Sequence, residues 1–584
     1  MYQHALRTIV LGGMWALAAA ENGTLAAPPQ PVPTLGARLL VPAGSIAQDE
    51  PAVVPGGGDV TQVPFDRLTW HIPDPERAYR EGQVLLEKAR EANNMADAAF
   101  FARVLERIGQ VRRPKQLHLS LEDVVHRTLA NNYSIQRVSY NPAIETTRVV
   151  EAEAAFDAVF YTNVNKNNID RPSGSELAAT DIDLFDMSVG VRKFLPTGTM
   201  LDGHYDLGRT KQAFAFQTIN PAYTSNFVLD MRHPLLQGFG IDYNRSVIFV
   251  AKNNRQISDL GFKRQIRDVL RSVEELYWRL VQTRRDVVIT AREVAEFEGI
   301  YEYLVARSEF DVNPVQISAS KADLHSAQYD FVNRRAIMFD AQDRLIALMN
   351  DPEILLADQV ELIPDDFPAV ERIVVDAMLE VQTALDNRAE LKEQELRVAN
   401  ARLLLGRAKN AELPRLDLTF RTSIDGLAIN ADKSFDEATR VKYVEYMIGV
   451  ELEVPIGNRA PRAAHHRARL EHAQAAAALR QSIEEIILDV NLAVRELATS
   501  YDQIGPSFEA AEAREREVES IVARAERKDF NTLLSELGAR RSLANIRRAM
   551  ANAVVEYNIA ITDLERAKGT LLNYNNVVIP TETD

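Results

Sequence analysis

The chain has 584 residues, a formal net charge of −16 and no cysteine. The acidic balance argues against nucleic acid as a partner, and the absence of cysteine excludes disulfides, thiolate metal sites and cysteine nucleophiles. No interior stretch offers about 18 consecutive apolar residues, so no ordinary membrane-spanning helix is predicted.

The first residues have the features of an export signal. Arg7 gives a positive start, Ile9 to Ala20 form an apolar stretch, and small residues up to Ala27 suit cleavage, which predicts a signal peptide over residues 1–27. A buried N-terminal helix is the alternative, and the proline-rich sequence after Ala27 argues against it. Residues 28–74 are expected to form a Pro-rich linker, and residues 75–116 a helical N-terminal extension.

From residue 117 onward the chain repeats one plan of short helix, strands and long helices. The first repeat covers residues 117–350, a connecting segment covers 351–370, the second repeat covers 371–577, and a tail covers 578–584. The opening helix of the first repeat is expected to be capped by Ser120, with Asp123 three residues later completing the cap.

Each repeat contains a β section, at residues 156–234 and 414–455. Apolar residues alternate with polar ones there, which is the period of a strand with one apolar face. The first section is longer by about the length of one hairpin with its loop. In the second section the alternation predicts a lipid-facing row made of Leu416, Leu418, Phe420, Ile448, Val450 and Leu452.

A very long helix follows each β section, at about residues 243–307 and 462–524. At 1.5 Å per residue, each would span roughly 100 Å. Such helices cannot be buried in a globule and must pack side by side as a bundle, a coiled coil or a tube. Each is followed by a turn and a return helix.

The ordered set of motifs resembles the TolC-like outer membrane efflux proteins. The likeness rests on Leu-Ser-Leu-Glu-Asp at 119–123 with Asn131-Asn132, on Arg-His-Pro-Leu-Leu-Gln-Gly-Phe-Gly at 232–240, and on Val-Pro-Ile-Gly-Asn-Arg at 454–459. The resemblance implies an α+β fold in which duplicated helix–strand–long-helix repeats form a trimeric transmembrane β-barrel, continued by a long periplasmic α-helical barrel. Family members usually contribute four strands per chain, so the added hairpin is a departure.

The resemblance also implies a non-enzymatic channel subunit in the cell outer membrane, with its helical part in the periplasm. Its expected partners are two further copies of the chain, outer-membrane lipid, a periplasmic adaptor protein and an inner-membrane pump, in efflux or type I secretion. No catalytic constellation, cofactor site or metal site is predicted. Asp181, Asp183 and Asp186 are expected to lie in a solvated loop, with a calcium site as the lesser alternative.

The turns after the long helices are the candidate functional residues. By the resemblance they form the periplasmic entrance and the adaptor contact; plain helix termination is the alternative. The residues assigned there are Arg307, Phe310, Asp311, Arg524, Lys528, Asp529 and Phe530. For the whole chain, the competing hypothesis is a periplasmic or surface coiled-coil scaffold without a pore.

Overall fold

The computed structural model describes residues 74–113, 115–172, 181–212, 218–309, 312–356, 360–524 and 530–579. The predicted signal peptide, nearly all of the predicted linker and most of the predicted tail lie outside these residues. The chain divides into two compact units. The sheet unit includes Asn141–Asp259 and Lys392–Arg480, and the helical unit includes residues 74–140, Leu260–Leu391 and residues 481–579.

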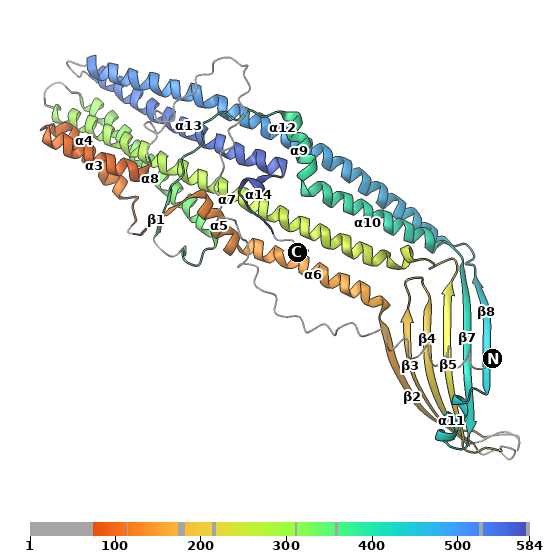
Figure 1. Cartoon of the computed structure of the whole chain (residues 1–584). Helices are drawn as coiled ribbons and strands as arrows, with labels where there is room; N and C mark the ends of the chain where they lie inside the picture. Colours follow the sequence, from red (N-terminus) through yellow and green to blue (C-terminus); the bar gives the residue numbers. More distant parts are fainter. Residues whose placement is uncertain are drawn as a thin grey trace. The chain divides into compact units, whose positions relative to one another are not determined.

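The sheet unit is built on one six-stranded sheet in which every neighbouring pair is antiparallel (Figure 1). The strand order is β2-β3-β4-β5-β7-β8. The strands are β2 (Ala158–Asp170), β3 (Asp181–Phe194), β4 (Met200–Gln212), β5 (Ala222–Pro234), β7 (Arg415–Ala428) and β8 (Tyr443–Glu453). The first β section therefore holds four strands and the second holds two.

The strands of the first section are longer than their alternating apolar residues indicate. Asp181, Asp183 and Asp186, expected in a loop, all lie on β3, so that expectation is wrong. Their pairing with β2 explains the error, because the cross-strand partners Asp170, Asn168 and Asn165 are polar as well. The alternation within β3 also changes phase, because Ile182 and Leu184 lie on the opposite face from Phe185 and Met187.

Glycines of the two Pro-containing motifs let the chain leave the sheet and enter a long helix. Gly238 and Gly240 have φ of 86° and 105°, and Gly457 has φ of 94°, in the left-handed region that favours glycine. Side-chain amides fix both exits: Asn410 Oδ1 accepts from the Gly238 N–H at 2.7 Å, and Asn458 Nδ2 donates to the Glu412 carbonyl at 2.9 Å.

The helices follow the duplicated plan. The first repeat has α5 (Leu121–Asn131), α6 (Tyr133–Glu153), α7 (Ile241–Ala306) and α8 (Pro314–Met349). The second has α9 (Ala377–Asn387), α10 (Ala389–Ala411), α11 (Ala431–Thr439), α12 (Arg459–Arg524), α13 (Phe530–Lys568) and α14 (Leu571–Tyr574). Both α7 and α12 contain 66 residues, and α12 continues through Pro506 without interruption. Ser120 and Asp123 form the predicted capping box of α5.

The N-terminal extension is a helical hairpin of α3 (Pro75–Glu91) and α4 (Met95–Gly109) that packs on α7. Its apolar side chains, such as Ile108, join the core cluster of α7 and α8. Two ion pairs flank this contact: Arg103 with Glu302 at 3.0 Å and Arg107 with Glu298 at 2.5 Å.

A small parallel sheet of β1 (Lys115–Leu119) and β6 (Val360–Pro364) joins the opening of the first repeat to the connecting segment. Arg284 of α7 anchors it. This guanidinium is fully buried, and it donates to Glu361 at 3.0 Å, to the Leu362 carbonyl at 3.0 Å and to Asp74 at 2.9 Å. A buried charge is tolerated when it is paired and hydrogen-bonded in this way.

Asp286 of α7 is a buried acid whose charge is less well paired than that of Arg284. Arg334 approaches its carboxylate only to 3.4 Å, and the carboxylate Oδ1 has no hydrogen-bond partner. Burial raises the pKa of Asp286 to about 6, against the opposing charges of Arg334 and Arg548. The folded protein therefore holds this proton more tightly than the unfolded chain does.

Replacing Asp286 by Asn should make the protein more stable at pH 8 than the parent. A folded-state pKa raised above the unfolded value gives stability that is present below pH about 4 and lost as pH rises through about 6. Two pKa units correspond to about 3 kcal/mol at most, so the gain at pH 8 should be roughly 2 kcal/mol, vanishing near pH 4. Thermal unfolding followed by circular dichroism tests this, with Asp340→Asn, an exposed acid on α8, as control. An identical pH dependence of parent and Asp286→Asn would contradict it.

Candidate channel wall and helix-turn tips

The six-stranded sheet has one apolar and one polar face. Residues directly opposite each other in an antiparallel register share a face, so each face can be followed across all strands. One row of the apolar face consists of Phe160, Val191, Gly203, Leu229, Thr422 and Tyr446. With strands of 11 to 14 residues, the sheet is long enough to span a bilayer.

The six residues predicted to face lipid lie together on this apolar face. They form three directly opposed cross-strand pairs: Leu416 with Leu452, Leu418 with Val450, and Phe420 with Ile448. On β8, Ile448 and Val450 are 68% and 66% exposed in the single chain. The structure thus brings together residues that are about thirty positions apart in sequence.

The opposite face carries most of the charged residues in the middle of the sheet. Its acids are Asp186, Asp202, Asp206, Asp230, Asp417, Asp425, Glu445, Glu451 and Glu453. Its arginines are Arg192, Arg232, Arg415 and Arg421. Arg232 of β5 links its strand to β7 and β8 by donating to Asp417 and Glu451, both at 2.7 Å. Because acids outnumber arginines, this face carries net negative charge.

The sheet ends in two edges. Among the described residues, β2 and β8 are each paired on one side only, so each presents a row of backbone N–H and C=O groups without strand partners. Every pairing is antiparallel and the strands are even in number, so β2 and β8 run in opposite directions. The free edges of two copies can therefore pair antiparallel.

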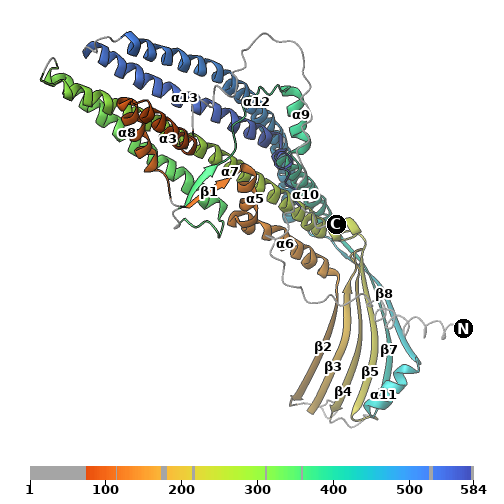
Figure 2. The ribbon, with the colours of Figure 1, turned by 60° about the vertical axis from the view of Figure 1, so that its left-hand side comes forward.

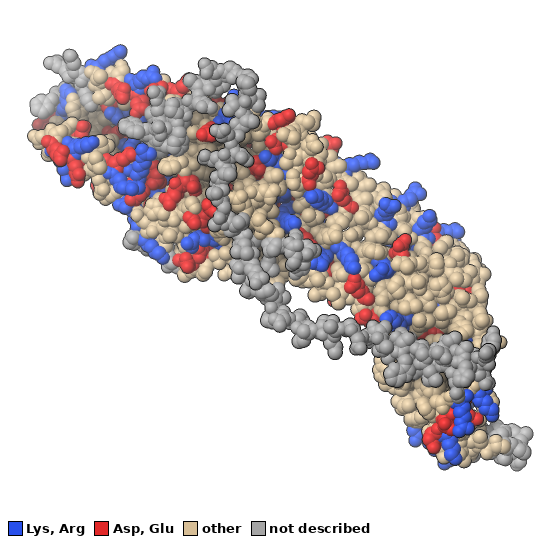
Figure 3. Space-filling view, viewed as in Figure 1, with Lys and Arg blue, Asp and Glu red and all other residues tan. Residues whose placement is uncertain are grey.

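The sequence gives no sign of α11, which lies in the β7–β8 connection and covers the apolar face beside the ends of β5 and β7 (Figure 2). The Ser434 and Ser225 hydroxyls are 2.7 Å apart, and Phe435 packs edge-on against Phe227. Gly426 permits the close approach, because a Cβ there would lie 2.1 Å from the Ser434 carbonyl oxygen. Charged side chains gather at this end of the sheet unit (Figure 3).

The helix-turn tips are described only in part. Arg307 directly follows α7, and its guanidinium donates to the Tyr303 hydroxyl at 2.6 Å. Arg524 is the exposed last residue of α12, and Phe530 is the first residue of α13. Phe310, Asp311, Lys528, Asp529 and the side chain of Phe530 lie outside the described residues. The entrance assignment therefore remains a prediction.

The described helices include none that is long and apolar enough to cross a membrane. The same residues hold no group of three or more His, Asp or Glu side chains placed to bind a metal ion.

The family model of the outer membrane efflux proteins matches residues 381–570. This stretch runs from α9 to α13, so it includes the second β section and the second long helix. The predicted resemblance to the outer membrane efflux proteins is confirmed over this stretch. Comparison with curated proteins gives no match.

Solved structures of this family share the fold. The outer-membrane channel OprN is 15% identical with a TM-score of 0.57, and the match covers 77% of this chain and 90% of OprN. The CmeC channel of Campylobacter jejuni is 14% identical with a TM-score of 0.56, and the match covers 77% of this chain and 86% of CmeC. The outer membrane protein VceC of Vibrio cholerae is 16% identical with a TM-score of 0.55, and the match covers 77% of this chain and 96% of VceC. The predicted TolC-like fold, with its duplicated helix–strand–long-helix repeats, is confirmed.

A lipid-facing apolar side predicts opposite results for neighbouring residues of the sheet. Leu418→Arg and Val450→Arg should each cost about 2 to 4 kcal/mol near the bilayer midplane and should lower the amount of assembled protein in outer-membrane fractions. Thr419→Arg and Glu451→Arg, on the polar face, should assemble normally and alter ion selectivity in planar bilayers. If the protein tolerates all four changes equally, the assignment of the faces is wrong.

Proposed function

We propose that the chain is the outer-membrane channel subunit of an efflux or type I secretion system, giving passive export to the exterior. The observation that carries the proposal is the sheet: its two faces differ in polarity, its strands are long enough to span a bilayer, and its edges are unpaired. The family match supports the same function.

The proposed assembly is a homotrimer. Backbone groups without partners cannot face lipid, so a transmembrane sheet has to close on itself. Three copies of a six-stranded sheet supply eighteen strands. Barrels of 16 to 18 strands leave an aqueous channel, and the apolar face would then meet lipid while the polar face lines the water. The excess of acids on the polar face favours cations in such a lumen.

Engineered cysteines can test the closure, because the chain has no cysteine of its own. Asn163→Cys on β2 is combined in turn with Glu445→Cys, Met447→Cys and Gly449→Cys on β8, all on the polar face. Strand pairing between copies brings one of these positions within disulfide distance, so oxidation should give a covalent ladder that ends at three chains on non-reducing gels.

The control pairs Asn163→Cys with Asp206→Cys on β4, an interior strand, and should give single chains only. A ladder that ends at two chains or continues beyond three contradicts the trimer. Absence of cross-links for every β8 position contradicts pairing between the edges.

The proposed partners at the helix-turn tips are a periplasmic adaptor and an inner-membrane pump. Three copies would place six helix-turn tips around one mouth, with Asp311 and Asp529 adding up to six carboxylates. Like charges held in a ring attract cations. The turns that contain Phe310 and Phe530 are the proposed contact for the adaptor.

The double change Asp311→Ala with Asp529→Ala should lower the cation preference of the channel in a planar bilayer. Asp340→Ala with Glu519→Ala removes the same charge from exposed positions on α8 and α12 and serves as the control. Phe310→Ala with Phe530→Ala should weaken co-purification of the adaptor and leave conductance unchanged. If both tip variants behave like the parent, these turns only terminate helices.

A non-channel coiled-coil scaffold is the second candidate function, and the long helices α7 and α12 are the observation in its favour. A scaffold does not need an apolar sheet face in lipid. Cell fractionation separates the two: recovery of the protein in the soluble periplasm supports the scaffold, and recovery in the outer membrane supports the channel.

A further inference from the structure

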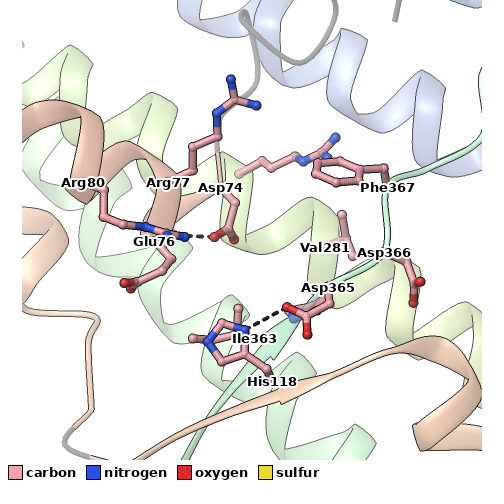
Figure 4. Close-up of a pocket in the computed structure, with 12 residues that line it drawn as sticks. Asp74, Glu76, Arg77, Arg80, His118, Val281, Ile363, Asp365, Asp366 and Phe367 are labelled. Atoms are coloured by element: carbon pink, nitrogen blue, oxygen red, sulfur yellow. Dashed lines mark hydrogen bonds and ion pairs between the residues drawn. The ribbon is translucent and has the colours of Figure 1, made fainter. Parts of the chain in front are cut away.

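A pocket of about 190 Å³ lies within the helical unit, apart from the channel wall and the helix-turn tips. The first turn of α3, the end of β1, the segment from β6 onward and α7 form its walls (Figure 4). Asp74 and Arg77 come from the start of α3, His118 from β1 and Arg285 from α7. Phe367, 62% exposed, adds an apolar surface.

Arg285 stands out among these residues because it is buried and has no hydrogen-bond or ion-pair partner in the described part of the chain. It is 8% exposed, and its buried Nε has no hydrogen-bond acceptor. Burial lowers the pKa of Arg285 to about 10, although the charge of Asp74 acts in the opposite direction. The preceding residue, Arg284, is fully buried and donates to three acceptors, and only its Nη2 has no partner among the described residues. An uncompensated buried charge is costly, so the side chain is set up for a counter-charge.

Each carboxylate at the pocket already has a hydrogen-bond partner other than Arg285. Their partners are Arg284 for Asp74 at 2.9 Å, Arg112 for Glu76 at 3.2 Å, His118 for Asp365 at 2.7 Å and Tyr277 for Asp366 at 2.7 Å. Figure 4 shows His118 and Asp365 pointing toward each other. In the described part of the chain, no carboxylate pairs with the guanidinium of Arg285.

We propose that this pocket binds a small oxyanion, a carboxylate or a phosphate, through the guanidinium of Arg285. A guanidinium offers a planar fork of donors that matches both groups, and such charge-assisted hydrogen bonds are stronger than those between neutral groups. Val281 and Phe367 beside it suit a ligand whose anionic group carries a small apolar part. The ligand would also touch α3, β6 and α7 at once, and so would hold the N-terminal hairpin to the first repeat.

The assembled full-length protein in detergent is titrated calorimetrically with two probes, inorganic phosphate and benzoate. At least one should bind, and the stronger probe identifies the source of the oxyanion: phosphate points to a free inorganic anion, benzoate to an organic acid. Arg285→Gln should weaken binding at least tenfold, because it removes the charge and the fork. Arg285→Lys should bind with intermediate affinity, since it keeps the charge alone.

The control is Arg344→Gln, which removes an exposed guanidinium from α8 and should bind like the parent. If neither probe binds to the parent protein, as would happen when a carboxylate of a neighbouring copy already fills the pocket, the proposal is overturned. Binding that survives in Arg285→Gln overturns it as well. Where Arg285→Gln fails to fold, the parent titration and Arg285→Lys decide the question.

Discussion

The backbone groups along the free edges of β2 and β8 are the constraint on which the rest of the structure depends. Each edge needs a strand partner, and the described residues include no further strand in this sheet to supply one. Because all pairings are antiparallel and the number of strands is even, an identical copy offers the required edge in the required direction. The distribution of side chains also suits a closed sheet. Apolar side chains lie on one face and polar side chains on the other, and a closed sheet separates two environments. Phe160 and Tyr446, at opposite edges of one register row, already present the same apolar face to the next copy.

The two repeats contribute unequally to this sheet, yet both keep the same connectivity. An even number of strands returns the chain to the end of the sheet at which it entered. Four strands in the first section and two in the second both satisfy this rule, so α7 and α12 start from the same end as α6 and α10 finish. A single hairpin is therefore the smallest addition that widens the sheet without redirecting a long helix. An odd strand would send one helix out of the opposite end, and the duplicated plan would be lost.

Periodicity in the sequence predicts most of this architecture because the responsible patterns are local. Leu416, Leu418 and Phe420 alternate with polar residues, and the register brings them opposite Leu452, Val450 and Ile448 as one apolar row. The ends of β2 and β3 that contain Asn168 and Asp183 escape prediction, because the alternation of β3 changes phase between Leu184 and Phe185 and the facing residues of β2 are mostly polar. The pocket escapes for a different reason. Arg284 and Arg285 are adjacent and alike in sequence, and only the tertiary positions of Glu361 and Asp74 give Arg284 two carboxylate partners.

The helix α11 resolves an inconsistency in the apolar face. Ser225 and Gly426 stand opposite each other on that face, where a hydroxyl and a bare backbone would make poor contacts with lipid. Both are covered: Ser225 is fully buried and shares a hydrogen bond with Ser434, and Gly426 leaves room for the backbone of α11. Neither residue therefore has to meet lipid. The uncovered part of the apolar face begins beyond the helix, and Phe435 packs edge-on against Phe227 at the boundary. The small and polar residues that interrupt the alternation mark the place where protein covers the sheet.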